Sequence, residues 1–208
     1  ISLYFGIKSA LNKNSFFDRF TGQLSLLSFS MPSFYLALLL VLVFSINFEI
    51  LPIAGLHSVS DDGSLNYYLD FAWHLILPIF IIVFGGIGSL VLYIRSLTIE
   101  ILKSDYIFFA RSRGLTSKQI LRYYILPNLY PPVITLLGLS LPGIIGGSVI
   151  LETIFSIDGM GLLFYQSALS HDYPVIMGIL IIGAFLTLIG NMIADLVLLK
   201  LNPNYEEK

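Results

Sequence analysis

Four stretches of this 208-residue chain are each long and apolar enough to cross a lipid bilayer. A bilayer core about 30 Å thick requires about 20 predominantly apolar residues in a helix. The stretches are Ser33 to Leu51, Trp73 to Ile94, Pro131 to Leu151 and Val175 to Leu199. Their apolar residues show no strong one-sided period, which is typical of helices surrounded by lipid or protein. The predicted fold class is therefore an all-α integral membrane protein, a polytopic helix bundle with about four spanning helices.

Composition agrees with this fold class and excludes several functions. Only 12% of the residues are charged, about half the share in a soluble domain. The absence of cysteine excludes disulfides, thiolate metal sites and a cysteine nucleophile. The net charge of −2 argues against nucleic acid as a partner.

The positive charges indicate how the helices are oriented. All eleven Lys and Arg residues lie before the first stretch, between the second and third, or after the fourth. The alternate loops, 52–72 and 152–174, contain none and are acidic. Because cytoplasmic loops are enriched in Lys and Arg, the segment 95–128 and both ends of the chain are predicted to be cytoplasmic. The two acidic loops are then predicted to face outward.

The segment 95–128 carries clear local helix signals. Thr116 and Gln119 form a capping box, so a helix is expected to begin at Ser117 and to run toward Leu126. Gly114 allows a tight turn between this helix and a preceding one over residues 105–113. Pro127 is expected to end the second helix.

One face of the first short helix combines aromatic, small and cationic residues. Tyr106, Phe109, Ala110 and Arg113 recur at spacings of three and four. Such a face is typical of a protein interface. It also fits an amphipathic helix lying on lipid headgroups, with Arg111 and Arg113 toward phosphate, and the spacing does not separate these two interpretations.

The chain resembles a known family over nearly its whole length. Ala110-Arg111-Ser112-Arg113-Gly114, followed by Ile125-Leu126-Pro127-Asn128, resembles the EAA loop of bacterial ABC importer permeases. Further stretches resemble the first of the two permease subunits in the dipeptide, oligopeptide and nickel group. These stretches are Ser30-Met31-Pro32-Ser33-Phe34, Leu51-Pro52-Ile53-Ala54-Gly55, His74-Leu75-Ile76-Leu77-Pro78, Glu152-Thr153-Ile154-Phe155, Gly159-Met160-Gly161 and Asp172-Tyr173-Pro174.

The resemblance implies a type I ABC importer permease of the bacterial cytoplasmic membrane. Such a subunit forms the translocation path for peptides and is not itself an enzyme. It binds no cofactor, since ATP and Mg belong to a partner ATPase. The implied partners are a second permease subunit, as a heterodimer, one or two ATP-binding subunits, an extracytoplasmic solute-binding protein and membrane lipid. The residues expected to contact the ATPase are Asp105, Tyr106, Phe109, Ala110, Arg111, Arg113, Gly114, Pro127 and Asn128.

The same resemblance sets the expected organisation of the chain. Residues 1–32 are expected to be a cytoplasmic lead-in, 33–199 the permease domain with its coupling loop at 95–128, and 200–208 a cytoplasmic tail. The chain begins at Ile1 without a methionine. Family members carry two further helices and an outer domain near their N-terminus, so the N-terminal helices are expected to be missing here.

A second candidate site lies in the loop after the third stretch. The resemblance places Glu152, Thr153, Phe155, Gly159 and Gly161 in a translocation path or outer gate. Glu152 would contact solute or binding protein, or would be solvated, or would cap the turn through Thr153. At position 158 this chain has Asp where the family group usually has proline.

Asn191 and Asp195 form a polar pair within the fourth stretch. An intramembrane carboxylate is a functional candidate by default. Because Asp195 lies near the cytoplasmic end, a contact with another helix or with Arg95 is favoured.

Other functions remain as alternatives. The cargo would alternatively be nickel, carried as a chelate, since the three histidines are too scattered to predict a metal site. An ion-coupled secondary transporter fits broken helices and one intramembrane carboxylate, but does not need the capped, glycine-hinged loop. No G-x-S-x-G or H-E-x-x-H motif occurs, so no catalytic residue is predicted.

Overall fold

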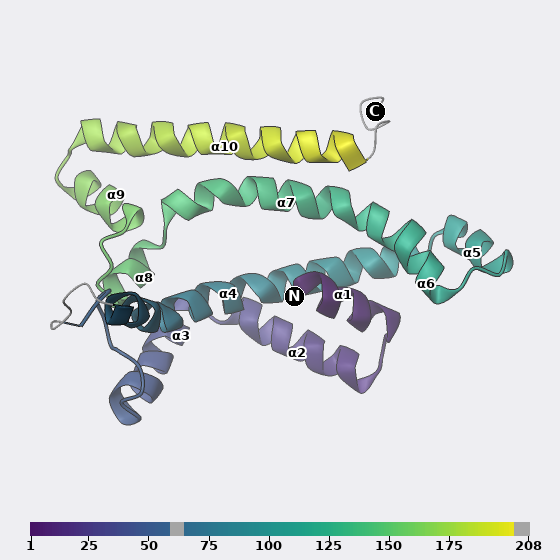
Figure 1. Cartoon of the computed structure of the whole chain (residues 1–208), viewed down its shortest axis with the longest axis horizontal. Coiled ribbons are helices and arrows are strands. Elements are labelled where there is room, and N and C mark those ends of the chain that lie inside the picture. Colours follow the sequence, from purple (N-terminus) through teal and green to yellow (C-terminus); the bar gives the residue numbers. More distant parts are fainter. Residues whose placement is uncertain (59–64, 202–208) are drawn as a thin grey trace. The chain divides into compact units, whose positions relative to one another are not determined.

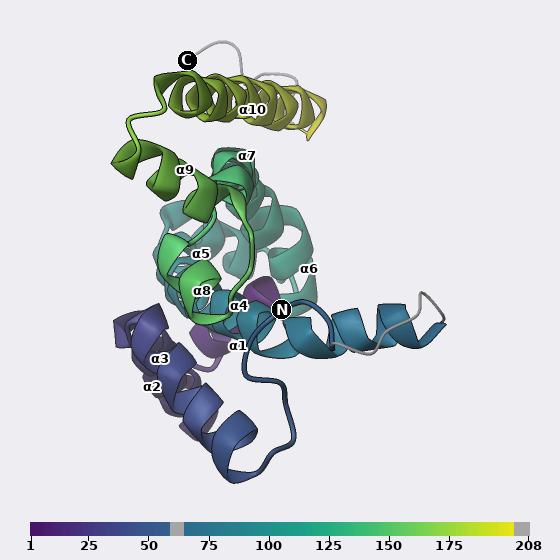
Figure 2. The same cartoon turned by 90° about the vertical axis from the view of Figure 1, so that its left-hand side faces the viewer.

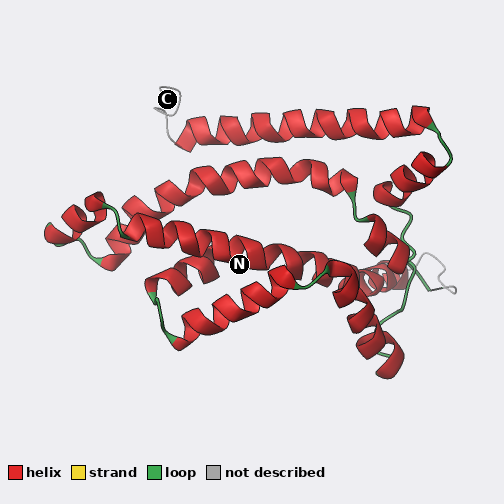
Figure 3. Cartoon of the chain, turned by 180° about the vertical axis from the view of Figure 1, so that it is seen from behind, coloured by secondary structure: helices red, strands yellow, loops and turns green. Residues whose placement is uncertain are grey.

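The computed structural model describes residues 1–58 and 65–201, and the regular secondary structure in these ranges is helical (Figure 3). The helices in chain order are α1 Ser2–Leu11, α2 Phe16–Ser30, α3 Ser33–Leu40, the π-helix η1 Val41–Asn47, α4 Leu65–Leu102, α5 Asp105–Ser112, α6 Ser117–Ile120, the π-helix η2 Leu121–Ile125, α7 Leu126–Gly146, α8 Val149–Ile154, α9 Met160–Leu169 and α10 Tyr173–Leu201. From residue 202 on, the predicted tail lies outside the described residues.

The chain divides into two compact units. Unit 1 contains Ile1–Leu27, Ile87–Pro142 and Ala184–Lys208, and unit 2 contains Ser28–Gly86 and Gly143–Gly183. The long helices α4, α7 and α10 each contribute to both units (Figure 1). The predicted coupling loop lies in unit 1 and the predicted outer loop in unit 2.

Two helices among the described residues are long and apolar enough to span a membrane, Tyr67–Leu102 and Tyr173–Leu201. The pair Phe16–Ser30 and Ser33–Asn47 qualifies when taken together, but it is bent by 98°. The bend occurs at Pro32, which precedes α3 with an extended ψ of 134°. The first predicted stretch is thus the second arm of a bent pair rather than a separate straight helix.

The third predicted stretch is broken near its end. Helix α7 stops at Gly146, and Gly147 has a φ of +53°, a conformation that glycine adopts without strain. Ser148 then caps a new short helix, α8, because its hydroxyl accepts a hydrogen bond from the Leu151 N–H at 3.4 Å. The apolar composition of 131–151 conceals this break, since both helices are apolar.

The expected helix end at Pro127 is wrong. Helical structure continues from α6 through the π-helical turn η2 into α7, and Pro127 is the second residue of α7. Proline is tolerated in the first turn of a helix, where an N–H group is not required for the intrahelical ladder.

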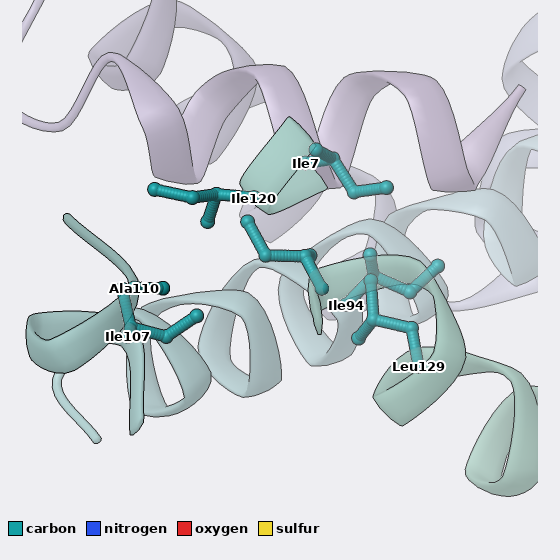
Figure 4. Packing of buried hydrophobic residues seen from close by; sticks show 7 residues of the cluster. Ile7, Ile94, Ile107, Ala110, Ile120 and Leu129 are labelled. Carbon is teal, nitrogen blue, oxygen red and sulfur yellow. The ribbon is translucent and has the colours of Figure 1, made fainter. Parts of the chain in front are cut away.

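The core of unit 1 joins the coupling loop to its neighbours. Buried Ile7 of α1, Ile94 of α4, Ile107 and Ala110 of α5 and Leu129 of α7 belong to one cluster (Figure 4). Ile120 and Ile125, from α6 and η2, complete it. Loop residues therefore share a hydrophobic core with two long helices and with α1.

The core of unit 2 packs the bent arm against two other elements. Leu36 and Ala37 of α3 and Val41 of η1 lie against Leu77 and Ile81 of α4. Leu151 of α8 and Phe155 complete this cluster. The loop that follows α8 is consequently anchored to the interior of its unit.

Candidate functional site

The turn between α5 and α6 is built around Gly114. Gly114 has a φ of +79°, and its N–H donates to the Arg111 carbonyl at 2.9 Å. The next N–H, from Leu115, donates to the Ala110 carbonyl at 3.2 Å. These two bonds form a Schellman motif, which ends a helix with a left-handed residue. The predicted glycine hinge is confirmed, and its reason is conformational, because no atom lies within 4 Å of a Cβ built at Gly114.

The predicted capping box at the start of α6 is also present. The Thr116 hydroxyl accepts from the Gln119 N–H at 3.3 Å, and the Gln119 side chain accepts from the Thr116 N–H at 2.8 Å. Both orphan donors are thereby satisfied. The turn and the box fix the path of the chain from α5 into α6.

Helix α5 has one buried and one exposed face. Ile107 and Ala110 are 1% and 2% exposed and belong to the core of unit 1. Phe108 and Phe109 are 68% and 63% exposed. Tyr106 is 42% exposed and stacks on Tyr124, with ring centroids 6.2 Å apart. The exposed face is therefore aromatic and supported from beneath by the core.

The exposed face of α5 differs from the predicted one in two residues, Ala110 and Phe108. Ala110 was predicted to contact the ATPase, but its side chain is buried in the core of unit 1. Its small side chain instead lets α5 pack closely on the unit. Phe108, which is not among the residues predicted for this face, is the most exposed aromatic residue of α5. Phe109, its neighbour in the sequence, contacts it edge-to-face with ring centroids 6.1 Å apart.

The other predicted coupling residues lie on the surface of unit 1. Asp105 is the first residue of α5, where a carboxylate is favourable beside the helix N-terminus. Arg111 and Arg113 are exposed at the opposite end of α5. Pro127 and Asn128 are exposed at the start of α7, where the Asn128 side chain donates to the Tyr124 carbonyl at 2.7 Å.

An ion pair with a buried carboxylate lies at the start of the segment 95–128. Arg95 of α4 contacts Asp18 of α2 with an Nε to Oδ1 distance of 2.6 Å, and Asp18 is 4% exposed. Ser9 also donates its hydroxyl to this carboxylate. Of the two contacts favoured for Asp195, the one with Arg95 is wrong among the described residues, because the ion pair of Arg95 is with Asp18.

Asn191 and Asp195 remain exposed on α10. The buried residues of this helix are Gly190, Ala194 and Leu198, which lie on a different face. Gly190 and Ala194 approach α7 closely, since a Cβ built at Gly138 would lie 2.8 Å from atoms of both. The polar pair thus lies away from the close contact between α7 and α10.

In unit 2, the predicted outer loop connects α8 and α9 (Figure 2). The Glu152 carboxylate accepts a hydrogen bond from the Leu162 N–H at 2.5 Å, in the first turn of α9. Thr153 is exposed, and its hydroxyl donates to the Val149 carbonyl at 2.7 Å, so it does not mediate the capping. The capping expected of Glu152 thus acts on α9.

The remaining residues predicted for this loop are mostly buried. Phe155 is 2% exposed, and its carbonyl accepts from the Gly55 N–H at 2.7 Å. Gly161 is buried in the first turn of α9, and Gly159 is the residue that precedes this helix. Asp158 and Gln166 line an open pocket of about 380 Å³ together with Gly159, Met160, Leu162 and Leu163.

Two of the three histidines lie beside the same carboxylate, that of Asp70. The Nδ1 atoms of His57 and His74 lie 3.9 and 3.4 Å from Asp70 carboxylate oxygens. His57 also stacks on Tyr67, with centroids 4.0 Å apart. Within the part of the chain that the structure describes, no group of three His, Asp or Glu side chains is arranged to hold a metal ion.

Comparison with known proteins matches residues 2–207 to one family, described as the binding-protein-dependent transport system inner membrane component. The chain is 37% identical over 206 residues to the oligopeptide transport system permease protein AppB of Bacillus subtilis, covering 99% of this chain and 64% of that protein.

Two further relatives have similar names. The oligopeptide transport system permease protein OppB of Haemophilus influenzae is 34% identical, and the dipeptide transport system permease protein DppB of Lactococcus lactis is 33% identical. Each match covers 95% of this chain and 61% of the relative. The chain therefore spans a little over three fifths of the length of these relatives.

Proposed function

The chain belongs to the family of binding-protein-dependent transport system inner membrane components, and from this premise we propose that it is the transmembrane permease subunit of an ATP-driven ABC importer. It forms part of the path by which solute crosses the cytoplasmic membrane and hydrolyses no ATP itself. ATP and Mg bind to a separate ATPase subunit. The apolar helices and the family match support this assignment.

The proposed cargo is a peptide. Relatives with 33 to 37% identity over nearly all of this chain are named dipeptide or oligopeptide permeases. A nickel chelate is the alternative cargo within the same class of permease, and the uptake experiment below separates the two.

The proposed contact with the ATPase is the exposed face of α5. The observation that carries this proposal is the division of α5 into a buried face, Ile107 and Ala110, and an exposed aromatic face, Tyr106, Phe108 and Phe109. Large exposed aromatic side chains on a well-supported helix are typical of interface hot spots. The concentration of Lys and Arg in 95–128 supports a cytoplasmic location for this face, where the ATPase would reach it.

A second permease subunit is the proposed partner of α10. Asn191 and Asp195 are exposed on a span whose apolar sequence favours lipid or protein surroundings. A carboxylate is costly in lipid unless it faces protein or water. We therefore place this polar pair toward the second permease subunit, as a heterodimer.

The loop between α8 and α9 is the proposed outer gate. Its support is the acidic character of the segment 152–174, which indicates an outward location, and the pocket of about 380 Å³ beside Asp158. An extracytoplasmic binding protein would deliver the peptide to this side.

Uptake measurements test the proposal. The complete gene is expressed in cells lacking its cognate permease, and uptake of a labelled peptide is measured with and without the cognate ATPase gene. We expect uptake that requires the ATPase and is inhibited by vanadate. Uptake driven by an ion gradient alone would show a secondary transporter, and uptake of labelled nickel without peptide uptake would show the alternative cargo.

A further inference from the structure

Helix α9 begins without a side-chain cap of its own. Its N-cap residue is Gly159, which has no side chain to accept from the free N–H groups of the first turn. The Leu162 N–H is nevertheless paired, because the Glu152 carboxylate reaches it from α8 at 2.5 Å. An anionic acceptor is favourable at this position, where the helix dipole is positive.

Glycines leave the room that this carboxylate occupies. A Cβ built at Gly159 would lie 2.6 and 2.7 Å from the two carboxylate oxygens of Glu152. A Cβ built at Gly147 would lie 3.1 Å from the Glu152 Cδ and 3.2 Å from the Gly161 nitrogen. Side chains at Gly147 or Gly159 would therefore displace the carboxylate from α9.

The other side of the loop is anchored independently. The Phe155 carbonyl accepts from the Gly55 N–H at 2.7 Å, and its side chain is buried in the core of unit 2. The Ile157 N–H donates to the Glu152 carbonyl at 2.8 Å. The Glu152 side chain thus makes a polar contact from the anchored α8 to the first turn of α9.

We propose that Glu152 is a positioning residue that caps α9 and thereby orders the start of α9 in the outer gate. This inference rests on the proposed function for the role of the loop, and it assigns Glu152 a different task from binding solute. Its carboxylate is committed to the backbone of the same chain, at the first turn of the helix that lines the pocket beside Asp158.

The sharpest test transfers the cap from Glu152 to residue 159. Glu152→Ala removes the carboxylate, and Gly159→Asp introduces an N-cap side chain. The backbone at Gly159, with φ −97° and ψ 174°, accepts any L residue. The nearest atoms to its Cβ all belong to Glu152. The double variant Glu152→Ala/Gly159→Asp therefore removes these contacts and supplies a side-chain cap of the usual type.

Peptide uptake by the complete transporter is the first readout. We expect Glu152→Ala to lose about tenfold in uptake, the change that corresponds to a lost charged hydrogen bond. Gly159→Asp alone is expected to lose uptake because its side chain collides with the Glu152 carboxylate. The double variant is expected to recover to within about threefold of the wild type, because Asp accepts from the same first-turn amides. A double variant as impaired as Glu152→Ala would overturn the proposal and would indicate that the carboxylate itself meets the solute.

Hydrogen exchange provides a readout that does not depend on transport. The Leu162 amide is expected to exchange faster in Glu152→Ala than in the wild type and to regain protection in the double variant. Unchanged exchange in Glu152→Ala would contradict the cap. If the wild type takes up no peptide, the proposed function fails, whereas the exchange comparison still decides whether Glu152 caps α9.

Two further variants keep the test interpretable. Glu152→Gln retains an acceptor oxygen and is expected to keep more uptake than Glu152→Ala. If the alanine variant does not reach the membrane, Glu152→Gln takes its place in the comparison with the wild type. Glu49→Gln removes an exposed carboxylate of the same unit, and uptake is expected to be unchanged. An equal loss in Glu49→Gln would show a general effect of charge and would overturn the specific role of Glu152.

Discussion

Arg95 holds the carboxylate of Asp18 with two parallel hydrogen bonds, from Nε to Oδ1 at 2.6 Å and from Nη2 to Oδ2 at 2.8 Å. The two residues are 77 positions apart in the sequence. Helix α4 leads into the coupling loop, and Ile7 of α1 packs in the core beneath that loop. The Arg95–Asp18 pair therefore attaches α1 and α2 to the part of unit 1 that supports the proposed ATPase contact. Bidentate pairing of this kind constrains orientation as well as distance.

Asp18→Asn is expected to destabilise unit 1 strongly. Asp18→Asn removes the charge that pairs with Arg95, whose side chain is 27% exposed. The cost is therefore expected to be that of hydrogen bonds to a charged group, about 1.5–3 kcal/mol, rather than that of a fully buried pair. Thermal unfolding of the purified protein in detergent measures this loss. Glu100→Gln, an exposed carboxylate on α4, is the matched control and is expected to change stability by less than about 0.5 kcal/mol. Equal melting temperatures for the two variants would contradict a stabilising role for the pair.

Phe109→Ala is expected to weaken binding of the ATPase by at least about tenfold, because truncation of a central aromatic anchor costs 1.4 kcal/mol or more. Co-purification with the tagged ATPase measures the change. The contrasting variant is Ala110→Leu on the buried face, which overpacks the core and is expected to lower stability by about 1–3 kcal/mol. Normal ATPase binding by Phe109→Ala would exclude the exposed aromatic face as the contact.

Gly114→Ala is expected to strain the turn between α5 and α6 by about 1–2 kcal/mol, since φ is +79° and a side chain is disfavoured there. Gly114→Asn is expected to cost less, because Asn tolerates this conformation. Gly22→Ala is the control, an unhindered glycine within α2 that is expected to be neutral or stabilising. ATP-dependent uptake and thermal stability are compared, and similar effects of Ala and Asn at position 114 would argue against strain.

Gly138→Ala is expected to separate α7 from α10. The new Cβ would lie 2.8 Å from the Gly190 carbonyl oxygen, a backbone atom that cannot move aside alone. Gly143→Ala on the same helix meets no atom within 4 Å and serves as the control. Thermal unfolding should show a lower midpoint for Gly138→Ala only. Equal midpoints would show that the two helices do not pack closely here.

The sequence predicted those features whose causes lie within a few residues. The capping box of Thr116 and Gln119 and the left-handed Gly114 depend on spacings of three or on a missing Cβ, so local pattern suffices for both. The apolar stretches likewise predict membrane helices, because the bilayer selects for length and composition. The helix over 16–30 before Pro32 and the break at Gly147 within 131–151 were not predicted, because length and apolar composition do not show where a helical segment turns.

Tertiary structure decided which side chains are free and which are committed. Arg95 is paired with Asp18 rather than Asp195. Ala110 lies in the core, and Phe108 lies on the surface. Glu152 caps a helix through an N–H group ten residues further along the chain. Composition and helical spacing by themselves determined a membrane protein with a capped, glycine-hinged loop. They could not determine these partners, because hydrogen bonds and burial across the fold depend on how separate helices pack, and helical spacing describes one helix at a time.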